Sequence, residues 1–368
     1  MNVYVDNAAS TKMNEHALTS MINCIKYFWG NPSSVHSIGR DAAMILEKAR
    51  ECIANCIGAK PNEIYFTSGG TEADNLAINT AKSGHIITSM FEHHAVLMPV
   101  AQKDNYSLLP VSDDGYVELY SLYENIRPDT KLASIMMANN EIGTIQPIKP
   151  LANICRNHRI LFHTDAVQAV GHIPVNVDDL GVDMLSASAH KFCGPKGIGF
   201  LYVRSGIDVA PLVTGGGQEN GIRSGTENLP GIVGMAVALR DAVMNIDDKI
   251  SYVSGLRDRL LNGVSKICGV SVNGGLDHRL PGNVNISIEG VNGMALLALL
   301  DQHGIFASSG AACSSTSGEL SHVLKSIGLS DDMAQSSIRF SLSEQNNKNE
   351  IDYIIKTLSE VVAYLRIN

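Results

Sequence analysis

The stretch RILFHTDAVQAVGHIPVNVDDLGVDMLSASAHKFCGPKGIGFLYV, residues 159–203, decides the fold. It contains three apolar runs of strand length, at 159–165, 182–188 and 199–203. Four similar runs precede it, at 63–67, 85–88, 106–111 and 131–137, and stretches of helical length such as 71–82 and 150–158 lie between them. This alternation predicts an α/β fold with a mainly parallel seven-stranded sheet, which would bind ligands at the carboxyl ends of its strands.

The sequence changes character after this region. Two long amphipathic patterns, at 228–243 and 250–268, are followed by shorter strand-like and helix-like segments. This mixture of short strand-like and helix-like segments predicts a second, smaller α+β domain. We therefore expect a large domain over 13–249, and a small domain formed by 1–12 and 250–368.

Composition and charge exclude several classes of protein. The chain has 368 residues, 45% of them hydrophobic and 18% charged, which is typical of a globular protein and rules out wholesale disorder. Its net charge is −9 and it has no block of Lys and Arg, which argues against a nucleic-acid or anionic-membrane partner. It also lacks an apolar run long enough to span a membrane and a signal-peptide pattern, so we expect a cytoplasmic protein.

The seven cysteines do not suggest a disulfide framework, because they are odd in number, scattered and without a Cys-x-x-Cys pair. Cys52 and Cys56 stand one helical turn apart, where burial is favoured over metal binding, and we expect no metal site. Cys313 differs from the others because it lies among small polar residues in the segment 306–329. That composition predicts a mobile loop with an accessible thiol, either a nucleophile and sulfur carrier or an incidental surface cysteine.

Residues 66–75, FTSGGTEADN, combine a strand end, two glycines and the start of a helix. Free backbone N–H groups and the positive helix end favour a phosphate there, although Thr71 and Asp74 are equally consistent with a routine helix cap. A second glycine-rich segment, TGGGQENGIRSGTEN at 214–228, predicts a loop that either approaches a ligand closely or forms an exposed turn.

Two further polar groups fall on the same predicted sheet edge. Asp165 ends one strand with Gln168 a turn later, and Lys191 follows the next strand within SASAHK (186–191). A partly desolvated lysine can form a Schiff base, whereas a strand-end carboxylate either pairs with a cation or caps the backbone. Together with an anion cradle, these groups meet the needs of pyridoxal phosphate.

Two adjacent histidines occur in EHHAV (92–96). An imidazole here could stack on a flat cofactor ring and exchange protons near neutral pH, although a structural histidine is the commoner case. Because neighbouring helical residues point about 100° apart, we expect His93 and His94 not to face the same site.

Ten motifs in order along nearly the whole chain resemble the cysteine desulfurases of the NifS/IscS type, class V aminotransferases of PLP fold type I. The motifs are DNAAST (6–11), GNPSSVH (30–36), TSGGTEADNLAI (67–78), EHHAV (92–96), NNEIG (139–143), HTDAVQ (163–168), SAHK (188–191), RSGTEN (223–228), SSGAAC (308–313) and SSIRFSL (336–342). The resemblance implies pyridoxal 5'-phosphate as the cofactor.

The resemblance also implies a role for each matching residue. Lys191 would form the Schiff base, Asp165 would pair with the pyridinium nitrogen, and His93 would stack on the ring and transfer protons. Asn140 and Gln168 would lie beside the ring hydroxyl, with Asn140 also near the substrate. The phosphate would contact Gly70, Thr71, Ser188 and His190. Arg339 would bind the substrate carboxylate, and Thr226 would reach the phosphate of a neighbouring subunit, which implies a homodimer.

The implied reaction converts L-cysteine to L-alanine and leaves the sulfur as a persulfide on Cys313. An acceptor protein, such as an Fe–S scaffold or a tRNA-thiolation carrier, would then take the sulfur. Alternatives are selenocysteine lyase or another class V PLP enzyme, although an aminotransferase has no use for a loop thiol. The sequence departs from the family at Ala311, where serine is usual, and at GELS (318–321), where Leu-Glu-Pro-Ser is usual. It ends at LRIN without a longer tail, which argues against docking of a standard scaffold through such a tail.

Overall fold

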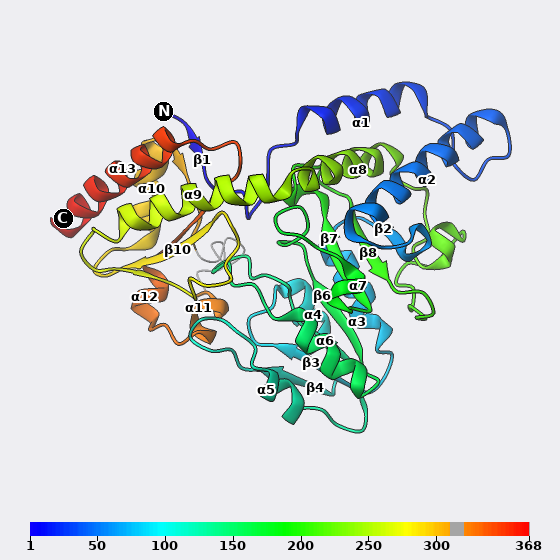
Figure 1. The fold of residues 1–368 in the computed structure, drawn as a ribbon, viewed down its shortest axis with the longest axis horizontal. Coiled ribbons are helices and arrows are strands. Elements are labelled where there is room, and N and C mark those ends of the chain that lie inside the picture. The colour runs from blue at the N-terminus through cyan, green and yellow to red at the C-terminus, as the bar shows by residue number, and fades with distance from the viewer. Residues whose placement is uncertain (310–319, 368) are drawn as a thin grey trace.

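A seven-stranded sheet organises the larger part of the chain (Figure 1). The computed structural model describes residues 1–309 and 320–367. The strands lie in the order β2-β8-β7-β6-β5-β3-β4, and neighbours are parallel except that β8 is antiparallel to both β2 and β7. Their bounds are β2 (Ile64–Thr67), β3 (His85–Ser89), β4 (Tyr106–Leu109), β5 (Thr130–Ser134), β6 (Leu161–Asp165), β7 (Met184–Ser188) and β8 (Gly199–Val203). Each predicted apolar run therefore overlaps one strand, and the predicted sheet is confirmed.

Helices cover both faces of this sheet, which explains why its strands are continuous apolar runs. Neighbouring residues on one strand pack into different cores: Ile86 lies with Leu76 and Val96, whereas Ile87 lies with Ile53 and Leu151. The first core is built on α3 (Gly70–Thr80) and α4 (His94–Ala101). The second is built on α2 (Ser37–Ile57), α6 (Ile148–Asn157) and α8 (Leu229–Val243), and α1 (Glu15–Tyr27) packs on α8. The short helices α5 (Leu119–Glu124) and α7 (Val177–Leu180) complete this part.

The C-terminal part contains a separate antiparallel sheet in the order β12-β10-β9. Its strands are β9 (Val270–Val272), β10 (Asn283–Ile288) and β12 (Ser337–Ser341). They lie with α9 (Ile246–Val264), α10 (Gly293–Gln302) and α13 (Lys348–Ile367), while α11 (His322–Ser326) and α12 (Asp331–Gln335) lie nearer the large sheet (Figure 1). The N-terminal β1 (Val3–Tyr4) pairs in parallel with β11 (Ile305–Phe306), so the first residues join this part.

One helix begins earlier than the sequence pattern suggests. Asn245 takes a left-handed conformation (φ 55°) that turns the chain between α8 and α9, and α9 starts at Ile246 rather than at 250. Within the described residues, no single helix is long and apolar enough to cross a membrane. The helices α8 and α9 reach that length and composition only as a pair, which is bent by 74°.

Candidate active site

A cavity of about 340 Å³ opens where the carboxyl ends of β3, β5, β6 and β7 meet the C-terminal part of the chain. The structure brings most of the predicted site residues to its wall: Gly70, Thr71, His93, Asn140, Asp165, Gln168, Ser188, His190, Lys191 and Arg339. Thr226 lies instead on an exposed loop, and Cys313 lies outside the described residues. Residues from distant parts of the sequence therefore converge on one sheet edge, as the strand pattern predicts.

Lys191 ends the short 3-10 turn Ala189–Lys191 that follows β7. Its Nζ donates hydrogen bonds to the carbonyl oxygens of Ala8, at 2.6 Å, and Ala9, at 2.8 Å. The amide of Gln168 donates to the same Ala8 oxygen at 3.0 Å. The N-terminal segment is thus part of the site. This contribution was not predicted, although DNAAST (6–11) is among the matched motifs.

Asp165 ends β6 and is buried, and its Oδ1 accepts the N–H of Val167 at 2.9 Å. Burial raises the pKa of this carboxyl, while the Val167 amide and the charge of Lys191 lower it. A second carboxyl, Asp74, is also buried on the cavity wall, and its Oδ1 has no hydrogen-bond partner among the described residues. Burial and the proximity of Asp165 raise the pKa of Asp74 well above its ordinary value. A protonated ring nitrogen placed beside Asp165 would pair with its buried carboxylate. The site therefore fits a pyridinium.

His93 is the N-cap of α4, and its Nδ1 accepts the N–H of Ala95 at 3.1 Å. Burial, then the charge of Lys191, lowers the pKa of His93 to about 4. The ring is therefore neutral near pH 7, and because Nδ1 accepts a hydrogen bond, its proton is on Nε2.

His94 also lines the cavity, so the expectation that the two histidines face different sites is wrong. The 100° spacing of helical neighbours does not apply because His93 precedes the helix in an extended conformation (φ −64°, ψ 150°). The ring of His94 stacks on that of His322, with centroids 5.0 Å apart.

The glycine-rich turn before α3 is shaped for an anion. The helix begins at Gly70 and its N-cap is Gly69, which provides no capping side chain within the described structure. The alternative interpretation of Thr71 and Asp74 as a cap is therefore wrong, and the first amides of α3 are left for a ligand. A Cβ on Gly70 would lie 2.7 Å from Cγ2 of Val167, so this position has no room for a side chain. These features fit a phosphate group.

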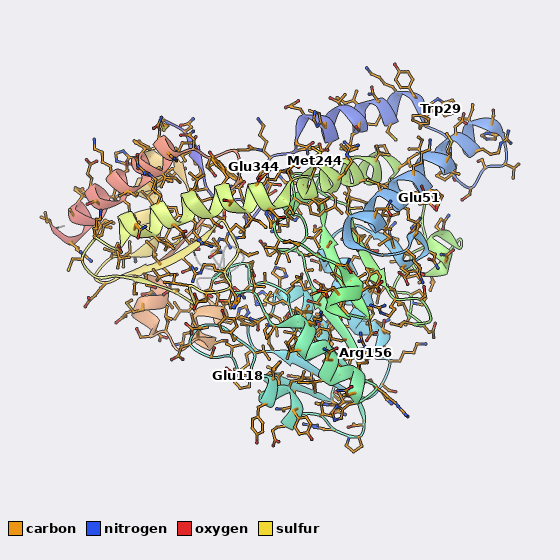
Figure 2. All side chains as sticks on the ribbon, viewed as in Figure 1. Trp29, Glu51, Glu118, Arg156, Met244 and Glu344 are labelled. Atoms are coloured by element: carbon orange, nitrogen blue, oxygen red, sulfur yellow. The ribbon has the colours of Figure 1, made fainter. Side chains whose placement is uncertain are left out.

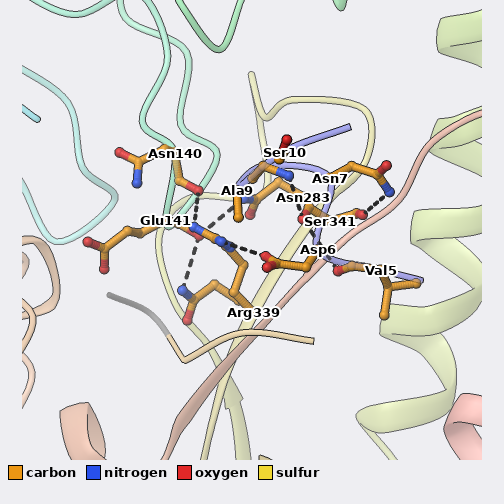
Figure 3. A network of polar contacts seen from close by, with 12 residues as sticks. Val5, Asp6, Asn7, Ala9, Ser10, Asn140, Glu141, Asn283, Arg339 and Ser341 are labelled. Carbon is orange, nitrogen blue, oxygen red and sulfur yellow. Dashed lines mark hydrogen bonds and ion pairs between the residues drawn. The ribbon is translucent and has the colours of Figure 1, made fainter. Parts of the chain in front are cut away.

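Arg339 projects from β12 into the same cavity and is almost fully buried (Figure 3). Its Nη1 donates to the carbonyl of Asn140 at 3.0 Å, and its Nη2 lies 2.8 Å from Oδ1 of Asp6. Its Nε has no partner among the residues that the structure describes. The ion pair with Asp6 was not predicted, because nothing in the sequence links residues so far apart.

Two buried glutamates of the cavity wall were also missed. Glu92 accepts hydrogen bonds from Ser89 Oγ and from the N–H of Met136, and burial raises its pKa to about 8. Glu141 accepts a hydrogen bond of 2.6 Å from Ser321 Oγ, and burial raises its pKa to about 7. Both stand inside matched motifs, EHHAV and NNEIG, but a sequence does not reveal that a glutamate is buried.

Comparison with known proteins agrees with this geometry. The model of the aminotransferase class-V family matches residues 3–354. A cysteine desulfurase IscS from Dictyoglomus turgidum is 48% identical over 375 residues, which cover 99% of this chain and 95% of the relative.

Solved structures are similar over the same length. A NifS-like protein has a TM-score of 0.93 and 38% identity, covering 99% of this chain and 100% of its own. A structure described as SspA in complex with cysteine has a TM-score of 0.82 and 36% identity, covering 93% and 99% of the two chains. The chain therefore belongs to the class-V aminotransferase family and, within it, to the cysteine desulfurases.

Proposed function

We propose that this cysteine desulfurase holds pyridoxal 5'-phosphate in the cavity described above and uses it to take the sulfur from L-cysteine. The observation that carries the proposal is the convergence of Lys191, Asp165 and the Gly69–Gly70 turn on one sheet edge. Lys191 would hold the cofactor through Nζ, Asp165 would pair with its ring nitrogen, and the turn with Thr71, Ser188 and His190 would hold its phosphate. When bound, this cofactor acts as an electron sink that makes the Cα proton of an amino acid acidic.

The residues around the cavity have complementary tasks. Arg339 would bind the substrate carboxylate beside Asn140, since a guanidinium suits a carboxylate, and its Nε has no partner in the described structure. The amine of Lys191 would take the proton from Cα. His93 presents a neutral ring with its proton on Nε2, so it would donate a proton and recover it during turnover.

Sulfur transfer requires a nucleophile, and we assign it to Cys313. Its thiolate would attack the sulfur of the substrate, the bond between that sulfur and the substrate carbon would break, and the electron pair left on the substrate would be protonated to give L-alanine. The product on the protein is a Cys313 persulfide, which an acceptor protein would consume through a second thiolate attack. We expect this chemistry in the cytoplasm.

Exposed apolar side chains support a homodimer. They lie along α1 and between α1 and α2, with Trp29 at the outer tip in Figure 2: Leu18, Ile22, Ile25, Trp29 and Val35. Leu18, Ile22 and Ile25 share one face of α1 by their helical spacing, and exposed apolar side chains gathered in this way mark an interface. Thr226 is exposed and does not line the cavity of its own chain, in keeping with a role in the cavity of a second copy.

A separate hydrophobic core in the C-terminal part supports the proposed division into a large unit over 13–249 and a small one formed by 1–12 and 250–368. Val3 and Val5 pack with Leu256 and Ile286 of the C-terminal part rather than with the large sheet.

The function is tested by incubating the purified protein with L-cysteine and a reductant while alanine and sulfide are measured. We expect a yellow protein that forms both products, and a Cys313→Ala variant that keeps the colour but loses turnover. A wild-type protein that stays colourless and inactive after addition of pyridoxal phosphate would refute the proposal. Sulfide release by Cys313→Ala would refute the assignment of the thiol.

A further inference from the structure

Two ion pairs that the catalytic scheme does not use hold the glycine-rich loop 214–228 to the phosphate turn, residues 68–71, and to the strand β2 that leads into this turn. The loop contains Glu219, which takes a left-handed conformation (φ 47°, ψ 46°), as does Asn220 after it (φ 54°, ψ 30°). Two consecutive non-glycine residues in this region are strained, and such strain persists only where surrounding contacts fix the backbone. The contacts of Glu219 therefore show what the loop is fixed to.

The first ion pair joins Glu219 to Arg50 of α2. The carboxylate accepts two hydrogen bonds from the guanidinium, at 2.7 and 2.9 Å, and both side chains are nearly buried. The same carboxylate accepts the N–H of Phe66 at 2.9 Å, and the guanidinium lies over the Phe66 ring at 4.5 Å. Because Phe66 belongs to β2, which leads directly into the phosphate turn, this pair fixes the loop to the strand that carries the turn.

The second ion pair joins the loop to the turn itself. Glu72, in the first turn of α3, accepts the N–H of Ser68 at 2.7 Å with one oxygen and Nε of Arg223 at 3.0 Å with the other. Although burial raises the pKa of Glu72, the hydrogen bonds from Ser68 and Arg223 hold it below the ordinary value, so the carboxylate is charged. Arg223 stands three residues before Thr226.

We infer that Glu219 and Glu72, each held by an arginine, are positioning residues that lock loop 214–228 and the turn 68–71 into one block and thereby set the affinity for the cofactor's phosphate. The inference rests on the proposed function, because it presumes that pyridoxal phosphate binds here. Neither glutamate lies on the cavity wall, so both act through the backbone groups and side chains that they hold.

The test compares binding of pyridoxal phosphate with binding of pyridoxal, which has the same ring but no phosphate. Apoenzymes of the wild type, Glu219→Gln, Glu72→Gln and Arg223→Gln are titrated with each compound, and the dissociation constants are taken from the visible absorbance. Glutamine keeps the size of glutamate and an acceptor oxygen but removes the charge. The matched control is Arg259→Gln, which removes an equally bidentate but half-exposed ion pair with Asp352, between α9 and α13.

We expect the dissociation constant for pyridoxal phosphate to rise about tenfold in the three variants, while that for pyridoxal changes little. Arg259→Gln should leave both constants unchanged. Equal weakening of the two compounds would indicate general loss of structure and overturn the inference, as would unchanged binding of pyridoxal phosphate. If Glu219→Gln does not fold, Glu72→Gln and Arg223→Gln decide the matter, because their ion pair is more exposed. A wild-type apoenzyme that binds neither compound would refute the proposed function itself.

Discussion

The carboxylate of Asp6 pairs with the guanidinium of Arg339, with 2.8 Å between Oδ1 and Nη2, so the arginine expected to receive the substrate carboxylate already has an anionic partner (Figure 3). The arginine is almost fully buried, whereas Asp6 is about one-fifth exposed. A buried guanidinium without a counter-ion would be costly, and Asp6 removes part of that cost. The same negative charge opposes the approach of a second carboxylate.

Asp6→Asn should therefore strengthen substrate binding. Asparagine keeps an acceptor oxygen for Nη2 but removes the negative charge, so repulsion of the incoming carboxylate disappears. We expect KM for L-cysteine to fall roughly three- to tenfold, since like charges about 4 Å apart repel each other by about 1 kcal/mol even at the dielectric constant of bulk water. Steady-state kinetics checks this, with kcat expected to change little.

The control for Asp6→Asn is Asp352→Asn, which neutralises a half-exposed partner of Arg259 far from the cavity. Its KM should match that of the wild type. A higher KM in Asp6→Asn would mean that the charge of Asp6 is needed to orient Arg339 and would contradict the repulsion argument.

Gly70→Ala should weaken the hold on the cofactor. The new Cβ would lie 2.7 Å from Cγ2 of Val167, so either Val167 or the first turn of α3 must move. Because the amides of that turn are expected to bind the phosphate, we predict at least about a tenfold rise in the dissociation constant of pyridoxal phosphate, or roughly 1.4 kcal/mol. Titration of the apoenzyme measures it.

The cause can be separated from a general effect of alanine. Val167→Ala in the Gly70→Ala background removes the clashing methyl group and should restore much of the affinity. Gly255→Ala, in α9, adds a Cβ with no atom within 4 Å and should leave binding unchanged while stabilising the helix by about 0.5–1 kcal/mol. If the double variant binds no better than Gly70→Ala, contact with Val167 is not the reason for the loss.

His93→Gln tests the assignment of proton transfer. Glutamine can still accept the N–H of Ala95 but cannot exchange a proton near neutral pH. We expect kcat to fall by about 10²- to 10⁴-fold, the usual contribution of general acid–base catalysis, while the yellow colour remains. His158→Gln, an exposed histidine at the end of α6, serves as the control. Unchanged kcat in His93→Gln would move the proton-transfer role to another residue.

The sheet and most of the cavity wall follow from local sequence patterns. Apolar runs such as 182–188 are strands because both faces are covered, and a polar residue at the end of such a run or a few residues after it must lie at the sheet edge. Asp165 and Lys191 are of this kind, and the structure places both on the cavity wall. Their proximity depends on strand order alone, since β6 and β7 are neighbours.

Other features depend on contacts between distant residues and have no local signal. Asp6 meets Arg339, and Glu141 meets Ser321, only after the C-terminal part has packed against the large sheet. The burial of Asp74 within α3 is likewise a property of the packed structure, since an aspartate is usually exposed. The prediction for His93 and His94 is wrong because it treats both as helical residues, whereas the helix begins at His94 and His93 is its N-cap.

Glu92→Gln should change the pH dependence of stability. Burial raises the pKa of Glu92 from its ordinary value of 4.5 to about 8, so between these values the folded protein binds one proton that the unfolded chain has lost. The contribution of Glu92 to the free energy of unfolding is therefore fully present below about pH 4.5 and falls as pH rises towards 8, by up to about 1.4 kcal/mol per pH unit. Glutamine keeps the acceptor for the Met136 N–H but does not titrate.

Denaturant unfolding of the apoenzyme at pH 5, 6, 7, 8 and 9 measures this difference. The free energy of unfolding of the wild type minus that of Glu92→Gln should decrease steadily over the series and level off above pH 8. Glu118→Gln, an exposed glutamate just before α5, should follow the wild type at every pH. A constant difference between wild type and Glu92→Gln would mean that the carboxyl is already ionised in the folded protein at pH 5, and that the hydrogen bonds from Ser89 and Met136 outweigh the cost of burying its charge.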